Sequence, residues 1–167
     1  MARALRDTKP EESPRTGPLI AAATLIGVGM GGFVDGIVLH QILQWHQMIS
    51  AKLPPVTLLN KEVNMFWDGI FHAFTWLTTA LGILLLWRLI YKRAVVLSNR
   101  LFGGGLLFGF GLFNMVEGLL DHHLLNLHNV REVSTNPSLW NYGFLAVSAV
   151  LLGAGWYIIQ QARKQYA

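Results

Sequence analysis

DGIVLHQILQWH, from Asp35 to His46, is a short polar pattern inside an apolar run, and it returns 82 positions later as EGLLDHHLLNLH, from Glu117 to His128. The two stretches align without a gap, and their acidic and imidazole side chains coincide: Asp35 with Glu117, His40 with His122 and His46 with His128. Glycines upstream align in the same register, Gly27 with Gly109 and Gly29 with Gly111. This internal repeat predicts two copies of one helical hairpin.

The composition around the repeat is that of a membrane protein. The chain has 167 residues, of which 53% are hydrophobic and 13% charged, whereas about a quarter of the residues of a soluble domain are charged. It has no cysteine, which excludes disulfides, thiolate metal sites, iron–sulfur clusters and cysteine nucleophiles. The net charge of +4 comes from basic residues spread along the chain, and it does not indicate nucleic-acid binding.

Four apolar segments, at about 19–48, 65–87, 101–127 and 139–159, each reach the roughly 20 residues that a helix needs to cross a bilayer. They predict an all-α integral membrane four-helix bundle. Because each copy of the repeat contains two spans, the two tandem hairpins are expected to be related by a pseudo-twofold axis along the membrane normal. Residues 1–17 are expected to form a flexible cytoplasmic tail, and residues 18–167 a single membrane domain.

Lysine and arginine predict the orientation, because the cytoplasmic connections of membrane proteins are enriched in both. Ten of the thirteen lie before the first span, between the second and third spans or after the fourth, and three lie in the other two connections. Both termini are therefore expected in the cytoplasm. All six histidines, and the four acidic residues within the apolar segments, then fall in the extracytoplasmic half of the membrane.

This gathering of histidine and carboxylate predicts a metal site, because ionisable side chains inside spans are costly and usually functional. The expected metal ligands are His40, His72, His122, Asp68 and Asp121, and the expected catalytic carboxylates are Asp35 and Glu117. Imidazole beside carboxylate suits a divalent transition metal such as zinc, iron or copper. His46, His123 and His128 are expected to be solvated at the membrane interface.

The spacing of these residues sets a condition on the helices. Asp35 and His40 are five residues apart, as are Glu117 and His122, and five residues turn an ideal α-helix through about 140°. Each pair therefore shares a face only if its helix carries a π-bulge, a feature common at functional sites.

The two halves differ where the second and fourth spans align, because Asn141 stands opposite Asp68 and Leu145 opposite His72. The third span has Asp121 where the first has Leu39. Polarity has thus moved from the fourth span to the third. We expect one metal site, off the axis and built by the first three spans.

Three segments, GFVDGIVLHQILQWH, FWDGIFHAFTW and GLFNMVEGLLDHHLLNLHNVRE, resemble a bacterial membrane-protein family catalogued as domain of unknown function 2243. The resemblance covers nearly the whole chain after the tail. It implies a four-span protein of the bacterial inner membrane. It also suggests a link to respiratory-oxidase assembly, which would favour copper.

Several functions fit these patterns. One is a metal-dependent membrane enzyme acting on a lipid-type substrate. Another is a metal-binding or copper-delivery protein that assists respiratory-oxidase assembly, with a membrane-protein partner or a second copy of the chain. A third is a b-type haem protein with His40 and His122 as axial ligands. A proton pathway fits less well, because the inner halves of the spans lack ionisable residues.

Overall fold

The computed structural model describes residues 15–92 and 96–166. Four long helical segments run through it: α1 (Gly17–Phe33) continued by η1 (Val34–Ile42), α2 (Leu58–Tyr91), α3 (Asn99–Glu117) continued by η2 (Gly118–Leu124), and α4 (Pro137–Arg163). Each segment is long and apolar enough to cross a membrane. The described residues contain no strand, so the all-α prediction is confirmed. Of the predicted tail, residues 1–14 lie outside the described part of the chain.

Polar side chains mark where three of the helices begin. The Thr57 hydroxyl accepts a hydrogen bond from the Asn60 amide at the start of α2, and the Ser98 hydroxyl accepts one from Leu101 at the start of α3. The Asn136 side chain does the same for α4, where Pro137 follows in the first turn. These residues satisfy amides that have no partner inside the helix.

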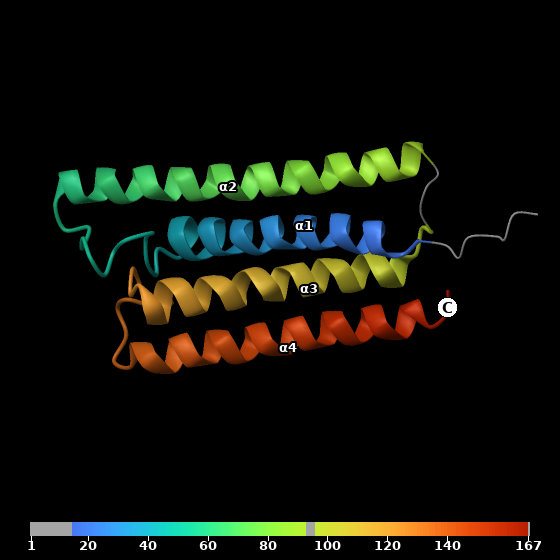
Figure 1. The fold of residues 1–167 in the computed structure, drawn as a ribbon. Helices are drawn as coiled ribbons and strands as arrows, with labels where there is room; N and C mark the ends of the chain where they lie inside the picture. The colour runs from blue at the N-terminus through green and yellow to red at the C-terminus, as the bar shows by residue number, and fades with distance from the viewer. Residues whose placement is uncertain (1–14, 93–95, 167) are drawn as a thin grey trace, which may run out of the picture.

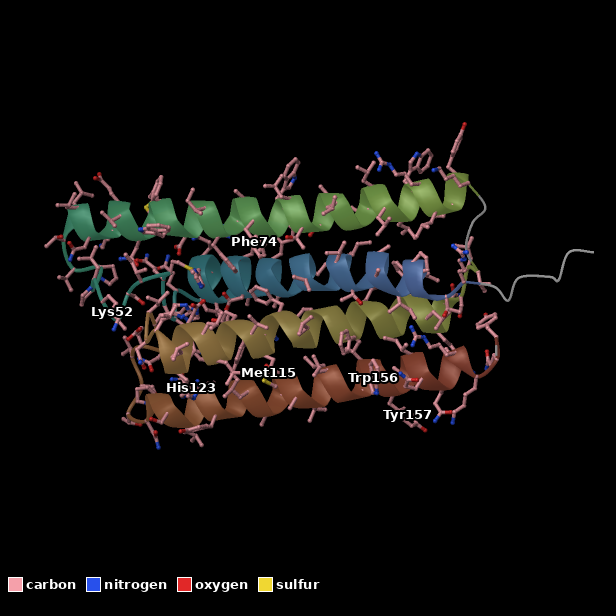
Figure 2. The ribbon with its side chains drawn as sticks, viewed as in Figure 1. Lys52, Phe74, Met115, His123, Trp156 and Tyr157 are labelled. Atoms are coloured by element: carbon pink, nitrogen blue, oxygen red, sulfur yellow. The ribbon has the colours of Figure 1, made fainter. Side chains whose placement is uncertain are left out.

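The helices lie side by side in the order α2, α1, α3, α4, with α1 and α3 in the centre (Figure 1). The central pair is more buried than the two flanking helices, whose outer faces are rich in exposed apolar side chains. The start of α1 and the end of α4 lie at one end of the bundle, and the connections 43–57 and 125–136 lie at the other (Figure 1). Lys52 and His123 mark the connection end in Figure 2, whereas Trp156 and Tyr157 lie toward the opposite end.

Glycines let α1 and α3 approach closely. A Cβ atom on Gly27 would overlap the backbone carbonyl of Leu106, and one on Gly109 would overlap the backbone carbonyl of Thr24. Small residues at such contacts allow the backbones of membrane helices to pack directly against each other. The central pair therefore fixes the relative depth of the two π-helical ends, η1 and η2.

The first and third helical segments end earlier than their apolar runs. The predicted spans 19–48 and 101–127 were too long at their C-terminal ends, because the helices stop at Ile42 and Leu124. Gln44 and Asn126 then have φ values of 50° and 49°, a left-handed conformation that ends a helix. The backbone turns back at both places, with Trp45 N bonded to Leu39 O at 2.9 Å and Leu127 N bonded to Asp121 O at 2.7 Å.

The two connections that follow are joined to each other. Ala51 N donates to Leu127 O at 2.9 Å, and Glu132 N donates to Trp45 O at 3.0 Å. The Arg131 guanidinium lies against the rings of Trp45 and Trp140, 5.3 Å and 5.2 Å from their centroids. These contacts hold both connections over the ends of η1 and η2.

Candidate metal centre

η1 and η2 are π-helical, which is the geometry that an acid and a histidine five residues apart need in order to share one face of a helix. In a π-helix each amide bonds five residues back, so residues five apart lie one turn apart on the same face. His40 Nε2 is 3.1 Å from Asp35 Oδ2, and His122 Nε2 is 2.8 Å from Glu117 Oε1. Both acid–histidine pairs are buried inside the bundle.

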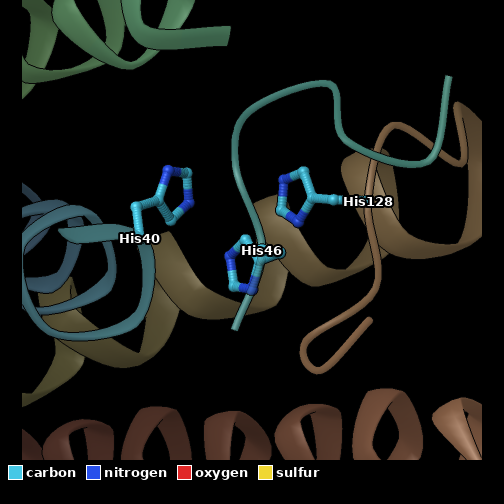
Figure 3. A group of neighbouring side chains, drawn as sticks. All are labelled: His40, His46 and His128. Atoms are coloured by element: carbon cyan, nitrogen blue, oxygen red, sulfur yellow. The ribbon is translucent and has the colours of Figure 1, made fainter. Parts of the chain in front are cut away.

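His46 and His128 join these pairs because the backbone turns back after each π-helix. Their rings stack with centroids 4.3 Å apart and an interplanar angle of 5°. His46 also lies against His40, with centroids 4.4 Å apart, and His128 lies against His122 at 4.8 Å. Figure 3 shows His40, His46 and His128 gathered in one place.

The expectation that His46 and His128 are solvated was wrong, because 3% and 1% of their surfaces are exposed. The left-handed turns at Gln44 and Asn126 send the following residues inward, toward the bundle, whereas a helix running on would have carried them toward the interface. His123 lies outside the cluster, and its Nδ1 donates to Gly118 O at 2.8 Å.

Two groups of potential metal ligands result, and they share one histidine. One group is His40, His46 and His128, and the other is Glu117, His122 and His128; within each group the ligand atoms lie within 4.8 Å of one another. Asp35 belongs beside the first group, because its Oδ1 is 3.6 Å from His46 Nε2. Glu117 Oε1 is in turn 3.8 Å from His128 Nε2.

Many polar atoms of this cluster have no hydrogen-bond partner among the described residues. They come from both carboxylates and all four imidazoles: Asp35 Oδ1, His40 Nε2, His46 Nε2, Glu117 Oε1 and Oε2, His122 Nδ1 and Nε2, and His128 Nδ1. Buried polar groups are normally satisfied, and exceptions require an explanation such as a bound ion. Imidazole nitrogen and carboxylate oxygen are also the donors that zinc, iron and copper(II) accept. The cluster therefore fits a transition-metal ion.

Hydrogen bonds from the surrounding residues orient two histidines of the cluster, His40 and His46. His40 Nδ1 lies 2.9 Å from Asp68 Oδ1, and His46 Nδ1 lies 2.8 Å from Val130 O. A carboxylate and a carbonyl can only accept, so each Nδ1 donates, which leaves each Nε2 as the atom that could bind an ion at the centre. Asp68 also accepts from Met48 N at 2.8 Å.

The structure places the other predicted ligands at the margin. Asp68 accepts a hydrogen bond from His40 but belongs to neither group. His72 is in neither group among the described residues; its Nε2 approaches Gly36, and its ring lies beside Phe71. Asp121 is half-buried and also belongs to neither group. The structure thus does not bring His40, His72 and His122 together as one set of ligand atoms, and the role of His72 as a ligand stays a prediction.

A largely apolar groove of about 340 Å³ reaches the cluster from the side of the bundle. Its walls come from three helices: Val28 of α1, Phe71 and Phe74 of α2, and Val116 of α3 among them. Glu117 and Asp121 also line it. Phe74 and Val116 are exposed on the apolar surface that a membrane would cover. A separate cavity of about 570 Å³ lies among the connections and reaches His46.

Burial lowers the pKa of His128 well below its usual value, and the neighbouring imidazoles of His46 and His122 lower it further. Removing an imidazolium from water is costly, and any positive charge on the neighbours adds repulsion. His128 is therefore neutral at pH 7, the form in which an imidazole can bind a metal.

This shift of the His128 pKa predicts how the metal-free protein responds to acid. The unfolded chain takes up a proton near pH 6.5, the ordinary histidine value, while the folded protein still excludes it. The contribution of His128 to the unfolding free energy is therefore fully present above about pH 6.5. It falls as the pH drops toward the lowered pKa, by up to about 1.4 kcal/mol per pH unit. The measurement is the unfolding free energy of metal-free protein in detergent between pH 8 and pH 5. His128→Gln should show a shallower fall, and an unchanged slope would contradict the assignment.

The fold and this site define a class: a helical membrane protein with a buried cluster of histidines and carboxylates at one end of its spans. The chain belongs to the family described as predicted membrane protein (DUF2243), whose model matches residues 22–162. The resemblance carried by the three motifs is thus confirmed. No match to this chain was found among curated proteins or among solved structures.

Proposed function

We propose that this protein is a metal-dependent membrane enzyme that acts on a lipid-type substrate. The observation that carries the proposal is the buried convergence of four imidazoles and two carboxylates, with eight of their polar atoms lacking a hydrogen bond among the described residues. The metal ligands are His40, His46, His122 and His128 with Asp35 and Glu117. A divalent ion there supplies Lewis acidity and acidifies bound water.

The groove supports a lipid-type substrate, because its apolar walls suit a hydrocarbon chain and two acidic residues, Glu117 and Asp121, are among its lining. Glu117 lines the groove and also lies 2.8 Å from His122, so it connects the substrate space to the ligands. Asp121 lines the groove without belonging to either ligand group. We assign Asp121 the task of carrying a proton to or from the substrate.

The orientation completes the proposal. Six described basic residues lie at the start of α1 or α3 or near the end of α2 or α4, opposite the two connections: Arg15, Arg88, Lys92, Arg100, Arg163 and Lys164. Lys52, Lys61 and Arg131 lie at the connection end, beside the cluster. By the positive-inside rule, we place both termini in the cytoplasm and the metal centre on the outer side of a bacterial inner membrane. The matched features of η1 and η2, 82 positions apart, support an origin by duplication with a pseudo-twofold axis between α1 and α3.

The contacts among the imidazoles count against the haem alternative. Axial ligands of a haem bind on opposite faces of a porphyrin, which needs open space between them. His46 and His128 instead fill the region between His40 and His122, because each of them contacts both of those rings.

Metal delivery is the second candidate, favoured by the cavity among the connections. This cavity leads to His46 and is lined in part by the polar side chains Gln44, Gln47 and Glu132. An ion could pass through it to a partner on the outer side, such as a respiratory oxidase under assembly. Delivery requires that ions leave readily, whereas an enzyme retains its ion through many turnovers.

A test of the enzyme proposal measures metal and turnover together. The full-length protein is purified, its metal content is determined, and it is placed in vesicles of phosphatidylethanolamine and phosphatidylglycerol whose lipids are followed by mass spectrometry. Protein that contains metal and converts a lipid supports the proposal. Metal without conversion, with rapid loss to a water-soluble chelator, favours delivery, and the absence of any metal contradicts both.

Filling the groove should separate substrate access from metal binding. We expect Val116→Trp to reduce lipid turnover at least tenfold and to leave the metal content unchanged, because the new ring occupies the groove away from the ligand atoms. Val150→Trp is the control, since Val150 is exposed on α4 and lines no described cavity near the cluster. Equal turnover in the two variants would contradict substrate entry through this groove.

A further inference from the structure

We propose that the centre holds two divalent transition-metal ions, one at each π-helical end, and that the half built by Asp35, His40 and His46 binds its ion more tightly. This inference rests on the proposed metal centre and concerns how many ions it takes and in what order. It departs from the single off-axis site that the sequence suggested.

The donors divide into two sets of similar shape. In the first half, Asp35 reaches His40 at 3.1 Å with one oxygen and His46 at 3.6 Å with the other. In the second half, Glu117 Oε1 lies 2.8 Å from His122 and 3.8 Å from His128. Ligands bound tetrahedrally at about 2.0–2.1 Å lie roughly 3.4 Å from one another. Glu117, His122 and His128 form one of the two ligand groups, whereas Asp35 lies beside the group of His40, His46 and His128 and reaches His40 and His46 with different oxygens.

The two sets lie close enough to form a two-ion site. The stacked rings of His46 and His128, 4.3 Å apart, bring the halves into direct contact. His128 is also a member of both ligand groups. Two-metal sites commonly hold their ions about 3.5–4 Å apart. One ion would use only some of the four imidazoles and two carboxylates and would leave other buried donors without a partner.

The two halves are expected to differ in metal affinity, because only in the first half do hydrogen bonds to Nδ1 fix the orientation of both imidazoles. Asp68 fixes the ring of His40, and the Val130 carbonyl fixes the ring of His46. The Nδ1 atoms of His122 and His128 have no hydrogen-bond partner in the described part of the chain. Loss of such outer hydrogen bonds typically weakens metal binding by 10–100-fold. We therefore expect the first half to bind at least tenfold more tightly.

The difference between the two halves follows from one aligned pair of residues, Asp68 on α2 and Asn141 on α4. Both accept a hydrogen bond from the connection, Asp68 from Met48 N at 2.8 Å and Asn141 from Val130 N at 3.0 Å. Asp68 also reaches an imidazole, whereas the Asn141 amide donates to Asn129 Oδ1 at 2.9 Å. The second half thus keeps the contact that positions its loop and lacks the one that orients its histidine.

The experiment loads metal-free, full-length protein in detergent with Zn²⁺ alone and counts bound ions after gel filtration. The wild type should hold two ions, and a chelator titration should remove them in two steps separated by at least tenfold. Asp35→Ala and Glu117→Ala should each hold one ion, and the ion remaining in Glu117→Ala should resist the chelator better. Asp68→Asn keeps an oxygen in place of Oδ1, which accepts from both Met48 N and His40 Nδ1, but removes its negative charge, and it should hold two ions with a smaller separation.

The outcomes distinguish this inference from the proposed function. One ion in the wild type, lost in both carboxylate variants, would overturn the two-ion centre and leave a metal enzyme in place. Two ions removed in a single step would overturn the order of binding. No bound ion in wild-type protein that elutes as a single folded species would overturn both proposals. The thermal unfolding of each variant, measured without metal, shows whether a lost ion reflects a lost fold.

Discussion

Purified protein carrying His46→Ala and His128→Ala together is expected to retain no measurable metal, a loss of far more than 100-fold in affinity. The double change removes one imidazole from each half, and one of the two, His128, is the residue that both ligand groups share. Only one imidazole and one carboxylate remain on each side, which is fewer than the three protein ligands of ordinary catalytic zinc sites. Elemental analysis of the purified variant measures the result.

The matched control is the double variant His72→Ala and His123→Ala. It removes the same number of imidazoles from the same end of the bundle, and both residues lie outside the two ligand groups. We expect wild-type metal content in this control. If the control loses its metal while His46→Ala with His128→Ala keeps it, the ligands are those that the sequence suggested and the assignment made from the structure is wrong.

The second large effect is expected at the contact between α1 and α3. Gly109→Val should prevent recovery of folded protein, because the new Cβ meets the backbone carbonyl of Thr24, which cannot move aside as a side chain could. Overpacking of a core usually costs about 1–3 kcal/mol, and a clash with backbone lies at the upper end or beyond. Gly27→Val should behave alike, because its Cβ meets Leu106 in the same way.

Gly103→Val and Gly153→Val serve as controls for these substitutions. Both change the same residue type within a helix of the bundle, and a Cβ at either position has no neighbour within 4 Å among the atoms of the described chain. Detergent-solubilised protein is compared by gel filtration and by its thermal unfolding midpoint. Equal midpoints for Gly109→Val and Gly153→Val would show that α1 and α3 do not pack as described.

The spans could be predicted because the constraint behind them is simple. A bilayer requires about 20 consecutive apolar residues, and all four helical segments follow from this requirement. The ends of the first and third next to the connections could not be placed, because the left-handed residues that end them are Gln44 and Asn126. Neither is glycine, and the apolar pattern continues past both.

The candidate site was predicted in part. Its place at one end of the bundle followed from the positions of the acids and histidines, and the need for π-helical turns followed from the five-residue spacing. His46 and His128 were missed because residues at the very end of a predicted span, or just beyond it, were assumed to meet water. The repeat already held the signal that could have found them, since it aligns these two histidines as faithfully as it aligns His40 with His122.

The prediction about Asp68 and His72 shows where local spacing misleads. Four residues apart on α2, they share a face, and sequence alone treats them as one unit. In the structure Asp68 contacts His40, whereas His72 lies against Gly36 and Phe71. The distance from a neighbouring helix decides which of two aligned side chains reaches a centre, and that distance depends on packing throughout the bundle.

The shared histidine also bears on how the protein is assembled. Its two ligand groups draw on residues as far apart as His40 and His128, so neither hairpin alone can complete the centre around its bound ions. A ligand that binds only the complete native arrangement stabilises it by mass action, by about 2.7 kcal/mol at a hundredfold excess over Kd. In the proposed two-ion centre, bound ions would therefore cross-link the two hairpins.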